Sequence, residues 1–173
     1  MWLFAGALAV IASAAVHTQG PPPKTSDGKP DLSGVWRAAS DNYRRNLAAN
    51  GIQVPFQPWA AALFKQRQGS QGKGNPSERC LPQGVPAVML VREYPWKIVQ
   101  TPAATLILLD ESLHYRQIFT DGRGFPDETP PTWLGYSIGK WEGETFVADT
   151  AGLTEETWLD DIGHPHGEAM HVI

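Results

Sequence analysis

Apolar and polar residues alternate over several short stretches in the second half of the chain, and turn-forming residues bound each stretch. Such alternation is typical of β-strands with one buried face. The joints at 110–113 and 142–143 are short enough for hairpins. We therefore expect a mainly β protein, an antiparallel meander that forms a curled sheet or a lipocalin-like barrel. The predicted strands cover residues 96–101, 105–109, 114–120, 136–141 and 145–150.

The last predicted hairpin also has a predicted register. If residues 142–143 form its loop, Lys140 faces Thr145 across the hairpin. Trp141 and Phe146 then lie together on the opposite face of the sheet, because successive side chains alternate between faces.

One stretch has helical rather than β periodicity. Pro58 suits the first turn of a helix, and the alanine-rich residues that follow it favour helix. Phe56, Ala60 and Phe64 share one side of such a helix, with polar residues around the remainder. We expect one short amphipathic helix over 58–68 that lies on the sheet or closes a barrel end.

The N-terminal part of the chain differs in composition from the rest. Residues 1–15 are apolar and end in small residues, which is typical of a signal peptide. This run is shorter than the roughly 18 apolar residues of a membrane span, so no span is expected after cleavage. Residues 16–30, rich in proline and glycine, predict a disordered linker, and residues 31–173 predict a single β domain. The expected location is secreted or periplasmic.

Charge and cysteine content narrow the classes of function. The net charge is −4, and neither sign forms a long run, which argues against a nucleic-acid partner. Cys80 is the sole cysteine, so the chain forms no internal disulfide. Neither Cys80 nor Ser137 has the flanking residues of an activated nucleophile. The sequence carries no signal for an oligomeric state.

The domain opens with a Gly-x-Trp pattern at Gly34 and Trp36. This opening is similar to that of lipocalin-like barrels, where glycine allows a close backbone approach and tryptophan plugs one end. The alternative is an ordinary buried tryptophan on a first strand. Both interpretations predict β structure at this point.

Three longer runs carry a wider resemblance. They are Pro-Asp-Leu-Ser-Gly-Val-Trp at 30–36, Trp-Glu-Gly-Glu-Thr at 141–145 and Gly-His-Pro-His-Gly-Glu-Ala-Met-His-Val at 163–172. On these runs the chain resembles a functionally uncharacterised group of exported bacterial proteins. Members of that group often have a histidine where this chain has Phe125, and they continue past Val172 with further strand-like sequence. The resemblance therefore implies export and a β domain that is incomplete at its C-terminus.

Residues 158–171 hold three of the five histidines, together with three carboxylates. His164, His166, Glu168 and His171 are candidate metal ligands, because imidazole and carboxylate groups bind divalent transition metals. On a strand the first three share one face while the fourth points away, and a helix also fails to gather all four. The alternative is a polar turn whose imidazoles bond to the backbone or to neighbouring aspartates.

Aromatic residues suggest a second kind of site. They can line the mouth of a barrel and hold an apolar or aromatic molecule, or they can fill the barrel and leave no cavity. The candidate ligand-binding residues are Trp133, Tyr136, Trp141 and Trp158, with the polar groups of Asp121 and Arg123.

Three functions are consistent with these patterns. The first is an exported β-barrel-like protein that binds a small apolar or aromatic ligand. The second is a metal-dependent enzyme that uses the histidine cluster and a divalent transition metal. The third is a structural envelope protein without a ligand. The sequence leaves open whether the protein catalyses a reaction.

Overall fold

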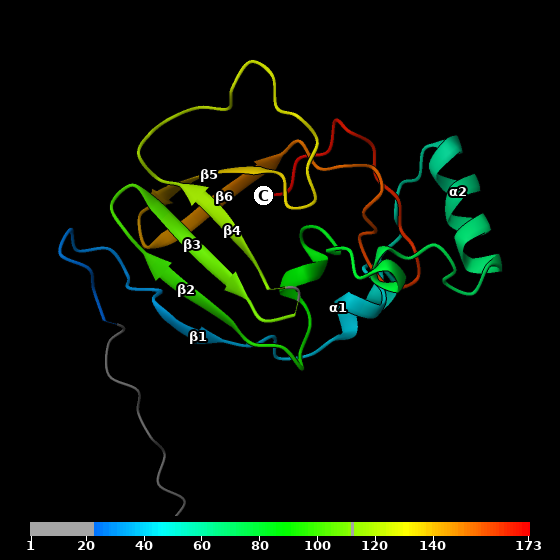
Figure 1. The fold of residues 1–173 in the computed structure, drawn as a ribbon, viewed down its shortest axis with the longest axis horizontal. Helices are drawn as coiled ribbons and strands as arrows, with labels where there is room; N and C mark the ends of the chain where they lie inside the picture. Colours follow the sequence, from blue (N-terminus) through cyan, green and yellow to red (C-terminus); the bar gives the residue numbers. More distant parts are fainter. Residues whose placement is uncertain (1–22, 112) are drawn as a thin grey trace, which may run out of the picture.

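The computed structural model describes residues 23–111 and 113–173, which form a β-rich fold (Figure 1). The expected signal peptide lies outside these residues, and so does the first part of the expected linker. The last part of that linker is ordered, since Lys24 and Pro30 form a β-bridge that closes a turn. No helix among the described residues is long and apolar enough to cross a membrane.

A single sheet contains the six strands of the described residues, in the spatial order β1-β2-β3-β4-β5-β6. The short strand-like runs of the sequence predict β2 to β6 at nearly their observed positions. β1 corresponds to the Gly-x-Trp opening. The strands are β1 (Gly34–Trp36), β2 (Trp96–Gln100), β3 (Ala104–Leu109), β4 (His114–Phe119), β5 (Tyr136–Glu142) and β6 (Thr145–Ala151).

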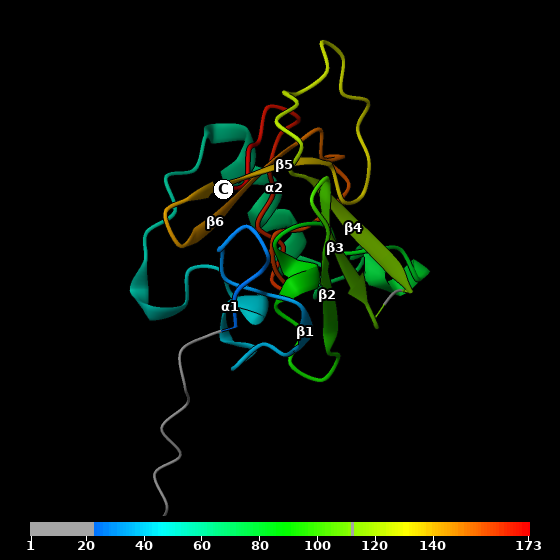
Figure 2. The ribbon, with the colours of Figure 1, turned by 90° about the vertical axis from the view of Figure 1, so that its left-hand side faces the viewer.

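The sheet is mixed and open, which departs from the expected antiparallel meander. β4 and β5 run parallel and pair only through Ile118 with Ser137 and Phe119 with Ile138. The long connection 120–135 makes this possible, because a parallel pair needs a crossover where an antiparallel pair needs only a tight turn. β1 and β6 end the strand order, so the described strands do not close into a barrel. Figures 1 and 2 show the β5–β6 hairpin turned steeply across β2 to β4.

The β5–β6 hairpin has a register two residues away from the predicted one. Glu142 pairs with Thr145, where the prediction paired Lys140 with Thr145. The turn that follows Glu142 begins with a glycine at a φ of 64°, a value that glycine adopts without steric cost. A shift by two keeps every side chain on its face. Trp141 and Phe146 therefore share a face as predicted, with ring centres 5.2 Å apart.

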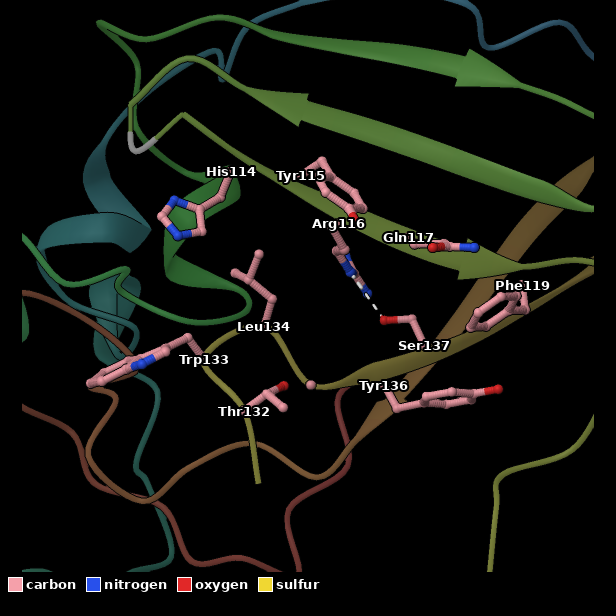
Figure 3. Close-up of a pocket in the computed structure, with 11 residues that line it drawn as sticks. His114, Tyr115, Arg116, Gln117, Phe119, Thr132, Trp133, Leu134, Tyr136 and Ser137 are labelled. Atoms are coloured by element: carbon pink, nitrogen blue, oxygen red, sulfur yellow. Dashed lines mark hydrogen bonds between the residues drawn. The ribbon is translucent and has the colours of Figure 1, made fainter. Parts of the chain in front are cut away.

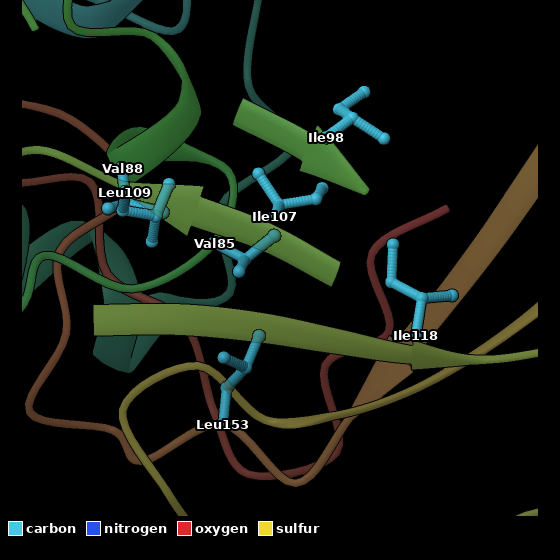
Figure 4. Packing of buried hydrophobic residues seen from close by; sticks show 7 residues of the cluster. All are labelled: Val85, Val88, Ile98, Ile107, Leu109, Ile118 and Leu153. Atoms are coloured by element: carbon cyan, nitrogen blue, oxygen red, sulfur yellow. The ribbon is translucent and has the colours of Figure 1, made fainter. Parts of the chain in front are cut away.

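The buried core lies against one face of β2, β3 and β4 (Figure 4). A segment that contains the short 3₁₀ helix Ala87–Met89 covers this face. Burying an aliphatic side chain of this size stabilises a fold by roughly 1.5–3 kcal/mol, so the cluster is a principal source of stability. Its buried members are Val85, Val88, Ile98, Ile107, Leu109, Ile118 and Leu153.

Trp36 does not plug a barrel end. It stacks on Trp96 of the neighbouring strand, with ring centres 6.1 Å apart, and stays 43% exposed. Its indole N–H donates to the carbonyl oxygen of Leu32, 2.8 Å away. The Gly-x-Trp opening thus produces a strand, as both interpretations predict, with an edge tryptophan in place of a buried one.

The predicted helix is present as α2 (Pro58–Gly69) and ends one residue later than expected. It packs against the C-terminal segment 158–167 and not on the sheet, as Figure 1 shows. The guanidinium carbon of Arg67 lies 4.7 Å from the ring centre of Trp158. A second, shorter helix, α1 (Asn42–Arg45), lies nearby. Two further 3₁₀ helices cover Ala49–Gly51 and Pro76–Arg79.

Candidate functional site

A cleft of about 420 Å³ opens between β4 and the segment that leads into β5 (Figure 3). It exists because the two strands pair only through the last two residues of β4. Within the described sheet, the first half of β4 therefore has no strand partner on this side. The lining residues are His114, Tyr115, Arg116, Gln117, Phe119, Thr132, Trp133, Leu134, Gly135, Tyr136 and Ser137.

Aromatic and aliphatic groups form much of the cleft wall. Trp133, Leu134 and Tyr136 come from the β5 side, and Phe119 comes from β4. The rings of Phe119 and Tyr136 stack with their centres 5.1 Å apart. Clefts of this size and lining are typical of sites for small organic molecules.

Arg116 occupies a core position of the sheet. In the cross-strand register it stands beside Ile107, which in turn faces Ile98, so two isoleucines precede it in the same row. The residue is only 8% exposed. Its Nε donates to the Ser137 hydroxyl at 3.3 Å and its Nη2 to the Thr150 hydroxyl at 2.6 Å. Figure 3 shows the side chain reaching from β4 towards β5.

The charge of Arg116 has no counter-ion among the described residues, where no carboxylate lies within ion-pair distance of it. Burial lowers the pKa of Arg116 to about 10, so the guanidinium is still protonated at neutral pH. Holding a cation there opposes folding by an amount on the order of 3 kcal/mol. Buried charges in proteins are normally paired, so an unbalanced one beside a cleft makes that cleft a candidate binding site.

The structure brings four of the six predicted ligand-binding residues to this part of the fold. Trp133 and Tyr136 line the cleft directly. The guanidinium carbon of Arg123 lies 4.0 Å from the ring centre of Phe119, a lining residue. Arg123 Nε also donates to a carboxylate oxygen of Asp121 at 2.9 Å. These hydrogen bonds hold the pKa of the exposed Asp121 carboxyl below its usual range.

The other two predicted ligand-binding residues lie elsewhere. Trp141 borders a separate, more polar depression of about 410 Å³ beside the N-terminal turn. Trp158 is 5% exposed and packs under Arg67, so it belongs to the packing between α2 and the C-terminal segment. The six residues therefore do not form one aromatic site.

The first predicted metal ligand, His164, is part of a buried structural pair. Its Nδ1 donates to the carboxylate of Asp160, while its ring stacks on Phe64 at 4.3 Å and on Phe56 at 5.5 Å. Asp160 also accepts from the backbone N–H of Leu47 at 2.7 Å and from that of His164 at 3.0 Å. The imidazole is therefore held by its own neighbours, as the alternative interpretation of a polar turn expected.

His166 has a different set of partners. Its Nδ1 lies 3.1 Å from the carbonyl oxygen of Gly167, and its Nε2 lies 2.6 Å from the hydroxyl of Thr157. A carbonyl only accepts, so Nδ1 carries the proton, and in the neutral ring Nε2 accepts from the hydroxyl. Desolvation lowers the pKa of His166, which favours this neutral form.

The remaining two predicted metal ligands lie at the surface. Glu168 is exposed, and the Nδ1 of His171 donates to Asp149 at 3.1 Å. No group of three or more histidine, cysteine, aspartate or glutamate residues in the described part of the chain is placed to hold a metal ion. The four predicted ligands thus take part in separate contacts. Their arrangement in the described residues does not support the metal site that the metal-dependent enzyme would need.

No family model matches the chain, and neither a curated protein nor a solved structure shows significant similarity to it. The resemblance to exported bacterial proteins therefore stays a prediction.

Sequence reasoning missed the two central polar residues of the cleft, Arg116 and Ser137. The strand pattern of the sequence contains a signal for Arg116. Arg116 and Ile118 are two residues apart on a predicted strand, so they share a face, and Ile118 is an obvious core residue. An arginine in an apolar row is the feature that would have pointed to this site.

Proposed function

We propose that the protein is an exported binding protein that holds a small apolar or aromatic molecule in the cleft beside β4. The observation that carries this proposal is the open cleft of about 420 Å³ with its aromatic lining. Its volume falls within the range of roughly 300–1,000 Å³ that small-molecule sites occupy. We further propose a calycin-like architecture, in which a curled sheet wraps the ligand.

Trp133 and Tyr136 are the proposed ring contacts. Both belong to the segment that enters β5, and both are only half-buried and line the cleft, so part of each ring is accessible to a ligand. Aromatic pairs contribute about 0.5–1.5 kcal/mol beyond the apolar area they bury. A flat aromatic ligand therefore gains more here than an aliphatic one of the same size.

Export is supported by the sequence alone. The apolar run over residues 1–15 has the length and the small-residue ending of a signal peptide. A binding protein outside the cytoplasm would meet ligands from the medium, which suits an open cleft.

A neutral aromatic probe tests the binding function. Naphthamide carries no charge, so isothermal titration calorimetry with it measures the apolar part of the cleft alone. We expect saturable binding, and we expect Trp133→Ala to weaken it by about tenfold, because one ring contact and its apolar area are lost. Trp59→Ala is the matched control, since Trp59 is 51% exposed on α2, away from the cleft.

The outcomes separate this function from its alternatives. Equal effects of the two tryptophan variants would move the binding site away from the cleft. Absence of saturable binding by naphthamide and by other neutral aromatic probes would overturn the proposal and favour the structural envelope protein.

A further inference from the structure

We propose that Arg116 is an anion anchor, so that the natural ligand of the cleft is an aromatic or apolar molecule with one carboxylate group. This inference rests on the proposed binding function and names the chemical class of its ligand. Three observations support it: the missing counter-charge of Arg116, its free donors and the apolar walls around it.

The missing counter-charge is the first observation. Arg116 is 8% exposed, and two acidic groups in the loops that flank β4 already have basic partners. Glu111 lies 3.6 Å from Arg44, and Asp121 bonds to Arg123. A buried charge is normally balanced by a partner or by a ligand. A ligand that brings one negative charge would supply the partner that the described chain lacks.

The free donors of Arg116 are the second observation. A guanidinium has five N–H donors, and among the described residues only one at Nε and one at Nη2 reach acceptors, the hydroxyls of Ser137 and Thr150. These two donors lie along the same edge of the planar guanidinium. The Nη1 group and the second hydrogen of Nη2 remain as a fork, which matches the two oxygens of a carboxylate.

The Nη1 end of this fork reaches accessible space. Among the described residues, the buried side-chain nitrogen and oxygen atoms that lack a hydrogen-bond partner are Trp96 Nε1 and Glu111 Oε2. Nη1 of Arg116 also lacks an acceptor among the described residues. Because it is not among these buried atoms, Nη1 must be partly accessible. The cleft is the accessible space that Arg116 lines.

The surroundings limit the ligand to a single small anionic group. The hydroxyls of Ser137 and Thr150 lie 2.9 Å apart and accept from one edge of the guanidinium. Trp133 and Leu134 contribute apolar surface to the cleft wall. Among the described residues that line the cleft, Arg116 is the one buried basic group. A monocarboxylate satisfies it, whereas a more highly charged molecule would leave further charges against apolar side chains.

Naphthoate and naphthamide test this inference, because they share one ring system and differ in charge. By isothermal titration calorimetry we expect the unchanged protein to prefer naphthoate by about tenfold or more, the usual effect of hydrogen bonds to a charged group. We expect Arg116→Met to abolish this preference while naphthamide binding persists. Arg45→Met is the control for net charge, since Arg45 on α1 pairs with Asp41 and is no part of the cleft.

Arg116→Lys completes the series. Lysine keeps the charge but lacks the fork, so we expect a reduced preference for naphthoate that stays above that of Arg116→Met. Equal affinity of the unchanged protein for both probes would overturn the anchor while the proposed apolar cleft stands, and this comparison needs no variant to fold. A preference that survives in Arg116→Met would overturn it too. Failure of both probes to bind would overturn the proposed function itself.

Discussion

The C-terminal loop 158–167 and the cleft beside β4 both bury ionisable side chains, and they differ in how far those groups are satisfied. In the loop, the carboxylate of Asp160 accepts from three backbone N–H groups and from the imidazole of His164. In the cleft, Arg116 uses two of its donors and meets no carboxylate of the described chain. A dense group of ionisable residues thus serves packing, whereas a single unsatisfied one marks the candidate site.

The loop is a junction between distant parts of the chain. Asp160 accepts from the backbone of Leu47, and Asp161 bonds to the side chain of Arg44 at 2.8 Å, so both hold the region around α1. On its other side the loop meets α2. There Gly163 lies so close to Arg67 that a β-carbon on it would stand 2.9 Å from that side chain. The loop therefore contributes to stability and leaves its imidazoles little freedom for chemistry.

Removing the central carboxylate of this junction should have the largest effect on stability. We expect Asp160→Ala to lower the free energy of unfolding by about 3–5 kcal/mol, because a buried imidazole, two buried N–H groups and one partly buried N–H group lose their acceptor. Urea unfolding followed by tryptophan fluorescence measures this change.

Asp161→Ala is the matched control for Asp160→Ala. The Asp161 side chain is 39% exposed and pairs with Arg44, so we expect a loss of only about 1 kcal/mol. A loss below about 1 kcal/mol for Asp160→Ala as well would contradict the structural role of the loop and would make its histidines candidates for function again.

Removing the charge of Arg116 should not lower the free energy of unfolding, in contrast to Asp160→Ala. We expect Arg116→Met to leave the free energy of unfolding unchanged or to raise it by about 1–2 kcal/mol, because an unbalanced buried cation is replaced by an apolar chain of similar length. Ser137 and Thr150 keep each other as hydrogen-bond partners. Burial lowers the pKa of Arg116 to about 10, so the protein without a ligand bears the cost of the charge at neutral pH and escapes it only above that pH.

The same urea unfolding experiment with Arg44→Met provides the comparison for this variant. Arg44 pairs with both Glu111 and Asp161, so we expect its removal to destabilise the protein by about 1–2 kcal/mol. If Arg116→Met lowered stability more than Arg44→Met, Arg116 would be a structural residue and the contrast between the loop and the cleft would fail.

Much of the fold could be predicted because its signals are local. Short strand-like runs bounded by turn residues predict β2 to β6, and Pro58 with the alanines after it predicts the start of α2. The register of β5 and β6 was wrong by two residues, since such a shift keeps each side chain on its face and leaves no trace in the alternation. The parallel pairing of β4 with β5 depends on the path of residues 120–135, which strand periodicity does not encode.

The candidate site was only partly predictable for the same reason. Trp133 and Tyr136 could be named because aromatic residues beside a strand are visible in the sequence. The partners of Arg116 and His164 come from tertiary contacts, and only these decide which group is satisfied. Ser137, for example, lies 21 residues from Arg116 along the chain. A sequence shows where charges are buried more readily than whether they are paired.

The smallest expected effect is on the pH dependence of stability. It tests whether His166 in the loop 158–167 is held in its neutral form. Desolvation lowers the pKa of His166 most, and the nearby charge of Arg67 lowers it further, against opposing effects of the Gly167 carbonyl and Glu155. As the pH falls through about 6.5, the ordinary histidine pKa, the unfolded chain therefore binds a proton that the folded chain still refuses. Stability should fall with a slope of at most about 1.4 kcal/mol per pH unit for this group.

Urea unfolding between about pH 8 and about pH 5 measures this slope, to which other ionisable groups also contribute. We expect His166→Gln to reduce the slope, because this variant removes the imidazole whose pKa burial lowers. An unchanged slope in His166→Gln would show that folding does not hold this imidazole neutral. His166 would then take up a proton in the folded protein despite its two hydrogen bonds. The ionisable groups of the loop would be less fully satisfied than the contrast with the cleft requires.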